Sequence, residues 1–314
     1  MDWADRIGRR IRLRDQHILL AVAECGSMSK ASVRLAISHP VVSKTVSDLE
    51  HSLGVRLFDR NSQGVELTTY GKALLDCGTS VFDEMRQGLK KIEFLANPNS
   101  GDLRIGCPEI ELAGSFPSIA EKFLERYPRV RLQVIHANTS MLQFDELRSR
   151  NVELLIGRAR PAIPEEDLTY ESLFGDSLVA VAGRGSPWTQ RRHLKLAELI
   201  EEPWVLPPYD SVPGPFVAQI FRASKLQPPP ASVSTLSAQL TITLIATGRF
   251  LGLLPRGVVR SSGAPLGLTT LPIKIPVHRI AVDIITVKNR TLSPLAELFI
   301  DCARDVVKTF VTDN

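Results

Sequence analysis

The sequence predicts a multidomain α/β protein with three parts: an N-terminal winged helix-turn-helix, a long linker helix and a C-terminal domain of two α/β lobes. Three observations predict this fold class. Residues 31–53 have the spacing of a helix-turn-helix, residues 69–95 keep one apolar seam at helical spacing, and strand-like and helix-like segments alternate after residue 101. The chain has 314 residues, more than one hydrophobic core usually serves, so several folding units are expected.

Residues 13–25 and 30–35 are predicted to form the first two helices of a small bundle. Apolar side chains in the first segment recur on one side of a helix, and Gly26 ends the run. Ser27 and Ser29 can both cap the second segment, in which small residues allow close packing. The first helix is therefore expected to bury Ile18, Leu19, Val22 and Ala23.

The third helix, residues 39–53, has two faces of different chemistry. Ser38 is a good N-cap, and Pro40 suits the first turn, where a missing N–H costs nothing. An apolar stripe should face a core and consists of Val42, Val46, Leu49 and Leu53. The opposite face carries short or polar side chains: Pro40, Ser43, Lys44, Ser47 and His51. Such a face can enter a DNA groove, because a recognition helix reads DNA with its N-terminal residues.

Residues 55–68 are predicted to form a β-hairpin, the wing. Gly54 ends the preceding helix, and two short β-like runs, VRLF and VELT, flank a turn at residues 61–64. Arg60 stands at the base of this hairpin, where it can meet a phosphate.

The residues expected to contact DNA follow from their hydrogen-bonding chemistry. Lys44 can bind a phosphate or a guanine edge, serine hydroxyls can donate to phosphates or bases, and Val41 can touch a thymine methyl group. Two interpretations of His39 stay open: it donates to guanine, or it only caps the helix. The predicted set is Lys30, Arg34, Ser38, His39, Pro40, Val41, Ser43, Lys44, Ser47 and Arg60.

Residues 69–95 are predicted to form one long helix with a seam close to that of a coiled coil. The apolar residues stand seven, four, four and three positions apart, and they are Leu74, Val81, Met85, Leu89 and Ile92. A lone helix of this length has nothing of its own to cover the seam. Pairing of two subunits is the favoured interpretation, and packing on the same chain is the alternative. Residues 96–101, ANPNSG, are the strongest linker signal in the sequence.

After the linker, strands and helices alternate in two sets, which predicts mostly parallel sheets with helices on both faces. The first set has strands at 103–107, 130–135 and 152–157 and helices at 115–127 and 141–150. The second set has strands at 178–183, 204–206 and 250–254 and helices at 194–200, 214–225 and 238–247, with a further short strand after Pro230. A final strand is predicted at 280–287 and a final helix at 293–310. If they return to the first sheet, the chain crosses between two lobes near 172–175 and near Pro276.

A cleft between two such lobes is a natural site for a small molecule, because ligands bind at the carboxyl ends of parallel strands. This rule selects Cys107, Pro108, Glu109, Ile110, His136, Ala137, Asn138, Thr139, Ser140, Gly157 and Arg158. Asn138 to Ser140 suit a carboxylate, or they only cap the helix that follows. The acidic Glu109 disfavours a simple anion, although Arg158 can neutralise it. The class of ligand stays open.

The order of these elements resembles the LysR-type transcriptional regulators. The resemblance is densest over residues 13–71 and is carried by Gly26, Ser27, Ala31, Leu35, Ser38, Pro40, Val42, Ser43, Leu49, Glu50, Leu53, Gly54, Leu57, Phe58, Arg60, Leu67, Thr68 and Gly71. A looser match continues through the segments 103–106, 127–128, 154–157 and 252–255. His39, Lys44 and Gln63 depart from the residues common in that family, which affects the expected operator sequence and not the fold.

The resemblance implies a periplasmic-binding-protein-like effector domain and a linker helix that pairs two subunits, commonly within a tetramer on bent promoter DNA. It adds the loop 207–212 of the second lobe, with Ser211, and the region around Ser237 to the effector site. The expected partners are double-stranded promoter DNA, a small-molecule effector, further copies of the chain and, for an activator, RNA polymerase. The implied domains are residues 1–70, 71–100 and 101–314, with lobe I at about 101–172 and 277–314 and lobe II at about 173–276.

Other function classes find little support. A net charge of +4 permits nucleic-acid binding without proving it. The sequence lacks the common nucleotide-binding, hydrolase and metalloprotease motifs, so no enzymatic activity and no cofactor are expected. No apolar run of transmembrane length and no signal peptide is found, which favours a cytoplasmic, nucleoid-associated protein and opposes an exported solute-binding protein. An architectural DNA-binding protein, whose lobes only assemble, stays open.

The four cysteines, Cys25, Cys77, Cys107 and Cys302, are widely separated and lack metal-ligand spacing. Neither a zinc site nor a secreted disulfide scaffold is expected. Cys107 has two interpretations: a redox-sensing thiol at the end of a strand, or a small buried hydrophobe, which is favoured because no partner cysteine is near.

Overall fold

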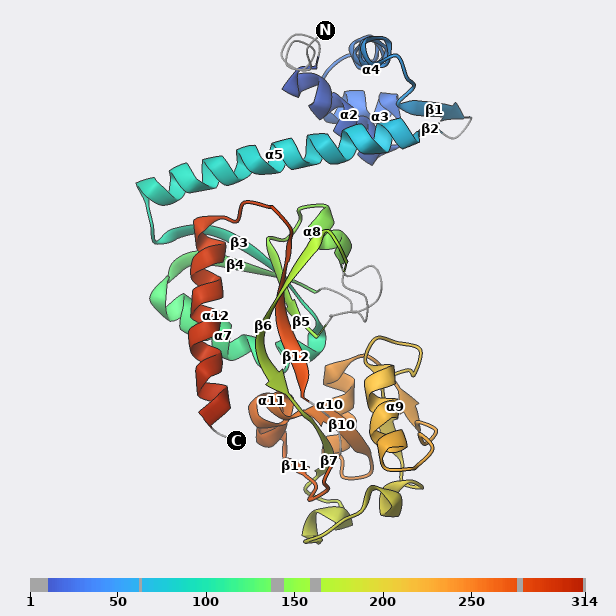
Figure 1. The fold of residues 1–314 in the computed structure, drawn as a ribbon, viewed down its shortest axis with the longest axis vertical. Coiled ribbons are helices and arrows are strands. Elements are labelled where there is room, and N and C mark those ends of the chain that lie inside the picture. Colours follow the sequence, from blue (N-terminus) through green and yellow to red (C-terminus); the bar gives the residue numbers. More distant parts are fainter. Residues whose placement is uncertain (1–10, 62–63, 137–143, 159–164, 276–278, 313–314) are drawn as a thin grey trace. The chain divides into compact units, whose positions relative to one another are not determined.

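The computed structural model describes residues 11–61, 64–136, 144–158, 165–275 and 279–312 (Figure 1). Contacts between residues divide the chain into two units, residues 1–89 and 90–314. No helix in these described ranges has both the length and the apolar character needed to cross a membrane.

The first unit contains the predicted helix-turn-helix. Its helices are α2 (Leu13–Cys25), α3 (Met28–Arg34) and α4 (His39–Leu53). Gly26 and Gly54 end α2 and α4 in the left-handed region, at φ 59° and 74°, as predicted for helix-ending glycines. The shared core consists of Ile18, Leu19, Ala21, Val22, Met28, Ala31, Val42, Val46, Leu49, Leu57 and Phe58. The predicted apolar stripe of α4 therefore faces this core, with Leu53 partly buried at its edge.

Helix caps decide where α3 and α4 begin. The Ser27 hydroxyl accepts a hydrogen bond from the Lys30 N–H, so α3 begins at Met28, two residues earlier than predicted. Ser38 occupies the N-cap position of α4 as expected, but its side chain makes no capping hydrogen bond. Pro40 lies in the first turn of α4, as predicted.

The wing is an antiparallel pair, β1 (Phe58–Asn61) and β2 (Gly64–Leu67). β1 begins at Phe58 and not at the predicted Val55, because the Glu50 carboxylate of α4 accepts hydrogen bonds from the N–H groups of Leu57 and Phe58, at 2.7 and 3.3 Å. The Val65 N–H donates to the Gly26 carbonyl at 3.0 Å. A Cβ atom on Gly64 would lie 2.3 Å from that carbonyl oxygen, so this close approach requires glycine.

The predicted linker helix is α5 (Thr69–Ala96). Its first turn is fastened by Thr68, whose hydroxyl accepts from the Gly71 N–H at 3.0 Å. Leu74 packs against the helix-turn-helix core. The rest of the predicted seam, Val81, Met85, Leu89 and Ile92, is exposed, with Val81 at 41% and Leu89 at 60%. One chain by itself therefore leaves this apolar stripe uncovered.

The second unit begins with a five-stranded sheet in the order β4-β3-β5-β12-β6. The strands are β3 (Ser100–Cys107), β4 (Arg129–His136), β5 (Leu154–Gly157), β6 (Leu168–Asp176) and β12 (Ile280–Val287). β3 pairs in parallel with β4 and β5, whereas β12 is antiparallel to β5 and β6. Within the described residues β12 is thus the one strand of opposite direction, and the predicted, mostly parallel sheet is confirmed.

Helices cover both faces of this first sheet, which together form lobe I (Figure 1). α7 (Phe116–Arg126) and α12 (Pro294–Thr312) pack on one face against Leu103, Ile105 and Ile156. On the other face, Leu147 of α8 (Asp145–Arg148) packs against Leu155 and Ile285. The alternation of Leu154, Leu155 and Ile156 between the two cores is the period of two expected of a buried strand.

The second sheet, the basis of lobe II, has the order β11-β7-β10-β8-β9. Its strands are β7 (Leu178–Gly183), β8 (Trp204–Leu206), β9 (Val233–Ser234), β10 (Leu251–Pro255) and β11 (Leu268–Thr270). α9 (Gly214–Ala223) packs on one face, and α10 (Ala238–Ala246) and α11 (Arg256–Val258) pack on the other. The predicted helix at 194–200 is a short 3₁₀ turn, Leu196–Leu199.

Several elements were not predicted. They are β6, β11, the short helix α6 (Glu109–Leu112), α11, and the 3₁₀ and π turns Pro187–Gln190, Val259–Gly263 and Ala264–Leu266. Because β6 continues to Asp176, the predicted crossing at 172–175 lies inside a strand, and the chain passes to the second sheet between Asp176 and Leu178. The crossing expected near Pro276 lies outside the described residues. The helix predicted at 141–150 is described only as α8, since residues 137–143 also lie outside them.

Candidate functional site

The N-terminal end of α4 presents most of the predicted DNA-contacting residues to solvent. The exposed ones on or next to α4 are Ser38, His39, Pro40, Val41, Lys44 and Ser47, and Ser43 is half-buried. Lys30 on α3 is exposed as well. This arrangement follows from the stripe of Val42, Val46 and Leu49, because burying it turns the polar side of α4 outward.

Two predicted cations are placed differently. Arg34 forms an ion pair with Glu24 of α2, so a phosphate has to compete with this carboxylate for the guanidinium. The backbone of Arg60 lies in β1, where it pairs with Val65, but its side chain is outside the described part of the structure. Gln63 at the wing tip is also outside it.

The start of α4 is open to an external acceptor. The Ser38 hydroxyl makes no capping bond, and the first turn of α4 contains no acidic residue. A hydroxyl donor and an adjacent imidazole at an uncapped helix start, with Lys44 a turn later, suit a phosphate or the acceptor edge of a base.

The second unit contains a cavity of about 250 Å³ between lobe I and lobe II. Lobe I contributes the residues that follow β3 and β5 and the last residue of β4, His136. Lobe II contributes residues that follow β8 and β9 and the end of β10. This position obeys the rule that ligands of α/β sheets bind at the carboxyl ends of parallel strands.

The structure brings only part of the predicted effector set to the cavity wall. The predicted residues that line it are Pro108, Glu109, Ile110, His136, Arg158, Pro207, Val212 and Ser237. Cys107 is fully buried in the core of lobe I, and Gly157 lies beneath Pro108, where a Cβ atom would be 3.0 Å from Pro108 Cγ. Ser211 is bound in a turn, where its hydroxyl donates to the Pro208 carbonyl at 2.5 Å. Ala137, Asn138, Thr139 and Ser140 lie outside the described residues.

The rest of the wall is mainly apolar and is contributed largely by lobe II, through Val205, Pro207, Val212, Pro213, Phe216, Val217, Leu236, Ala238, Leu253 and Leu254. Pro207 and Val212 belong to the loop that the resemblance implied, and Leu236 and Ala238 flank Ser237; the other six were not predicted. These residues belong to β8, α9, α10, β10 and the loops that precede or follow them. The apolar side chains of strands and helices in the sequence do not indicate which will face a cavity and which a core.

Glu109 connects the two lobes across the cavity. Its Oε1 atom accepts hydrogen bonds from the Ser237 hydroxyl and from the Gln239 N–H, both at 3.0 Å. The Ser237 hydroxyl also accepts from the Leu240 N–H at 3.3 Å and so caps α10. A carboxylate of lobe I therefore occupies the N-terminal end of a lobe II helix, a favourable position for negative charge.

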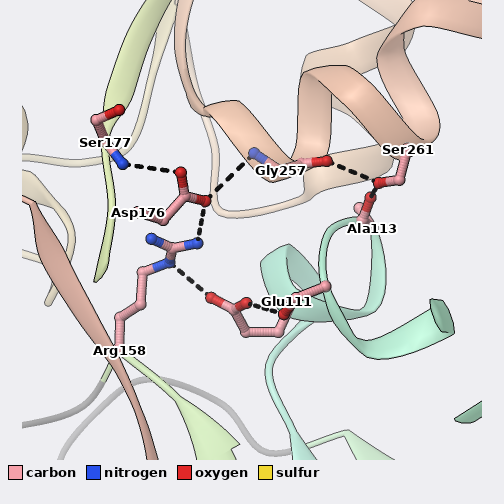
Figure 2. Close-up of polar contacts among 8 residues, drawn as sticks. Glu111, Ala113, Arg158, Asp176, Ser177, Gly257 and Ser261 are labelled. Carbon is pink, nitrogen blue, oxygen red and sulfur yellow. Dashed lines mark hydrogen bonds and ion pairs between the residues drawn. The ribbon is translucent and has the colours of Figure 1, made fainter. Parts of the chain in front are cut away.

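Two residues further along the turn, Glu111 takes part in a buried ionic cluster with Arg158 and Asp176 (Figure 2). Arg158 Nε lies 2.6 Å from Glu111 Oε1, and Arg158 Nη2 lies 3.0 Å from Asp176 Oδ2. The Ser115 hydroxyl donates to the other oxygen of Glu111, and the N–H groups of Ser177 and Gly257 donate to Asp176. Sequence reasoning singled out Arg158 but neither carboxylate, and Asp176 ends a strand that it missed.

The cluster fixes the charge of the guanidinium. Burial lowers the pKa of Arg158, but the neighbouring Glu111 and Asp176 carboxylates outweigh this effect, so the pKa lies above its ordinary value. The Nη1 atom of Arg158 is buried and has no hydrogen-bond partner among the described residues. Next to the cluster, the Ser261 and Ser262 hydroxyls both donate to the Ala113 carbonyl and tie the lobes together again.

Cys107 has the environment of a buried hydrophobe. Desolvation, with a smaller contribution from the charge of Glu111, raises the pKa of its thiol well above the ordinary value. The thiol is therefore neutral at physiological pH, which opposes reaction with oxidants. Among the described residues, no group of three His, Cys, Asp or Glu side chains is placed to hold a metal ion.

Comparison with known families matches both units. Residues 13–72 match the bacterial regulatory helix-turn-helix domain of the LysR family, and residues 96–308 match the LysR substrate-binding domain. The chain belongs to the LysR family. This regulator thus combines a helix-turn-helix DNA-binding domain with an effector-binding domain, and it regulates transcription through promoter DNA.

Relatives of this LysR-family regulator align over most of its length. YdcI of Escherichia coli, an HTH-type transcriptional regulator, is 28% identical over 306 residues, which cover 97% of this chain and 98% of YdcI. GbpR of Azospirillum brasilense is 26% identical over 293 residues, covering 91% of this chain and 83% of GbpR.

Solved structures share the fold of this LysR-family regulator. Full-length CbnR in complex with its target DNA has a TM-score of 0.64 at 21% identity and covers 94% of this chain and 100% of CbnR. Full-length OxyR from Pseudomonas aeruginosa has a TM-score of 0.67 at 21% identity, with 95% of each chain covered.

Proposed function

We propose that this regulator reads promoter DNA with the exposed N-terminal face of α4 and the wing, and that a small, largely apolar effector in the cavity between the lobes changes this binding. The observation that carries the proposal is the cavity of about 250 Å³, whose walls come from both lobes. A ligand that touches both lobes binds their two arrangements with different affinity and thereby shifts the population between them.

The proposed DNA contacts divide by chemistry. Lys44 and Arg60 bind phosphates, or a guanine edge in the case of Lys44; Ser38, Ser43 and Ser47 donate to phosphates or bases; Val41 contacts a thymine methyl group. His39 donates to guanine. Lys30 and Arg34 add phosphate contacts, Arg34 after exchange of its Glu24 partner. The exposure of the α4 side chains supports these roles.

We propose β5 as the element that carries the effector signal to the linker helix. β5 has four residues. Arg158, just after its last residue, lines the cavity. Glu153, just before its first residue, binds Lys90 of α5 at 2.5 Å and also accepts from the Ser293 N–H at 3.1 Å. A displacement of Arg158 by a ligand therefore reaches α5 through one short strand.

We propose that two copies pair through the α5 stripe of Val81, Met85, Leu89 and Ile92, and that two pairs form a tetramer. The exposure of this stripe supports the pairing, because apolar side chains at coiled-coil spacing gain stability when a second helix covers them. CbnR bound to its target DNA is similar in fold. A Leu89→Glu variant is expected to move the protein toward the monomer in light scattering, because it places a charge in the seam.

The proposal has three further parts. The protein acts in the cytoplasm on nucleoid DNA, contacts RNA polymerase where it activates a promoter, and has no enzymatic activity. The transcriptional regulators among its relatives support this assignment. The helix-turn-helix domain of the first unit supports a location at the chromosome.

A footprint on the DNA upstream of the protein's own gene, run with and without a panel of metabolites, tests the proposed function. A ligand is expected to change the length or the bend of the footprint. Leu236→Trp is the matched variant: Leu236 lines the cavity and is exposed, so the larger ring should obstruct ligand entry while leaving DNA binding intact. A footprint that no metabolite alters favours a purely architectural role.

A further inference from the structure

The effector cavity contains a carboxylate supplied by the protein itself. Glu109 extends from α6 of lobe I, and its Oε1 atom accepts hydrogen bonds from Ser237 and Gln239 at the start of α10. Both donors are also good partners for an anionic ligand. In this chain the position is already filled, so a ligand carboxylate has to displace Glu109 before it can bind there.

The charges around the cavity also oppose an anion. The ionisable residues that line it within the described chain are Glu109, His136 and Arg158. The one positive charge of Arg158 already faces two carboxylates, Glu111 and Asp176. The Glu111 side chain is fully buried, and that of Arg158 is 11% exposed, so solvent screens these charges weakly. A second carboxylate placed here meets net negative charge.

One polar atom at the wall remains for a ligand. Among the described residues, Glu109 Oε2 accepts no hydrogen bond, whereas the unpartnered Arg158 Nη1 is shielded by the protein. Oε2 therefore takes an N–H or O–H donor of the ligand. The remaining wall is mainly apolar.

We propose that Glu109 determines effector specificity: the cavity takes an uncharged, largely apolar molecule with a hydrogen-bond donor, and it rejects carboxylates. The inference rests on the proposed function, which assigns effector binding to this cavity. It names Glu109 as the residue that separates an amide or a similar neutral group from a carboxylate of the same shape.

Benzamide and benzoate form a matched pair of probes, because they have nearly the same shape and differ in charge and in the N–H donor. Their dissociation constants are measured by isothermal titration calorimetry on the full-length protein, with thermal shifts as a second readout. The wild type is expected to prefer benzamide by about tenfold or more, the ratio that one charge-assisted hydrogen bond supplies.

Three variants separate charge from structure. Glu109→Ala empties the start of α10 and is expected to reverse the preference, because the benzoate carboxylate takes the Ser237 and Gln239 donors. Glu109→Gln retains an acceptor oxygen for both donors but removes the charge, so the two affinities should become similar. Glu121→Ala removes an exposed carboxylate of α7, outside the cavity lining, and should behave as wild type.

Several outcomes overturn the proposal. Equal binding of benzoate by wild type and Glu109→Ala shows that Glu109 does not exclude anions. A second contrary result combines two variants. If Glu109→Ala lowers the melting temperature without gaining benzoate binding, and Glu109→Gln keeps the wild-type preference for benzamide, then Glu109 only connects the lobes and does not determine specificity. Absence of binding by both probes in every variant likewise overturns it. The metabolite-dependent footprint of the wild type tests the proposed function separately. The benzamide and benzoate results can therefore overturn the role of Glu109 without overturning the proposed function.

Discussion

The helices α4 and α10 begin in similar ways and belong to different units of this regulator. Both have a serine at the N-cap in extended backbone, Ser38 with φ −72° and Ser237 with φ −72°. At α10 the serine hydroxyl caps the Leu240 N–H, and Glu109 accepts from the preceding N–H, that of Gln239. At α4 the serine makes no capping bond, and the flanking side chains are exposed.

The difference teaches that a capping residue does not decide how a helix start is used. The start of α10 is satisfied internally, by a carboxylate 128 residues away in sequence from Ser237. The start of α4 keeps its hydroxyl, imidazole and Lys44 for an external acceptor. An open helix start suits a surface that must bind phosphates and bases, and a closed one suits a cavity that selects against anions.

The largest effect on stability is expected at the buried ionic cluster of Glu111, Arg158 and Asp176. Arg158→Met leaves Glu111 and Asp176 buried without their cation and should destabilise the second unit by about 3–5 kcal/mol. Urea unfolding followed by tryptophan fluorescence, to which the fully buried Trp204 of lobe II contributes, measures this change. Arg126→Met, which breaks an exposed pair with Asp305, is the control and should leave the urea midpoint nearly unchanged. Equal midpoints for the two variants would refute the assigned role of the cluster.

The next largest effect is expected on operator binding by the exposed start of α4. Lys44→Ala should weaken operator binding by about 1–3 kcal/mol, because it removes one contact of the reading face. Fluorescence anisotropy with labelled operator DNA at constant moderate salt measures the loss. Lys122→Ala, which removes an exposed cation of α7 in the other unit, is the matched control. Unchanged affinity of the Lys44 variant would rule out its proposed contact.

The smallest effect compares the two serines directly. Ser237→Ala loses the cap of α10 and the donor to Glu109, so the free energy of unfolding should fall by about 1 kcal/mol. Ser38→Ala loses no capping bond, so the melting temperature should stay nearly constant while operator affinity falls. Thermal melts and anisotropy on both variants test the contrast. A reversed pattern, with Ser38→Ala lowering the melting temperature, contradicts it.

The helices of the first unit could be predicted because their signals are local. Val42, Val46 and Leu49 define the buried face of α4 by their spacing alone. Gly26 and Gly54 end helices at positive φ angles, which glycine adopts without steric cost. The wing was predicted with one error, since β1 begins three residues late. Glu50 on α4 binds the backbone before β1, and no pattern within residues 55–58 reveals that bond.

The cavity was predicted in position but only partly in composition. The carboxyl ends of β3 and β5 indicated Glu109 and Arg158, because parallel strands bring their ends to one edge. Asp176, the second partner of Arg158, was not identified because β6, the strand that it ends, was not predicted. Ser211 lies close in sequence to the lining residue Val212, yet its hydroxyl turns to the Pro208 carbonyl. The spacing of residues along the sequence does not predict the direction in which such a side chain points.

By itself, the sequence determined the helix-turn-helix, the linker helix with its apolar stripe and the two alternating α/β sets, because periodicity and caps act between neighbouring residues. Only the tertiary structure decided which helix start stays open and which is closed. Glu109 reaches α10, and Arg158 reaches Glu111 and Asp176, through contacts between elements far apart in the chain. Such contacts depend on how the two sheets are arranged relative to each other, and no pattern among neighbouring residues encodes this arrangement.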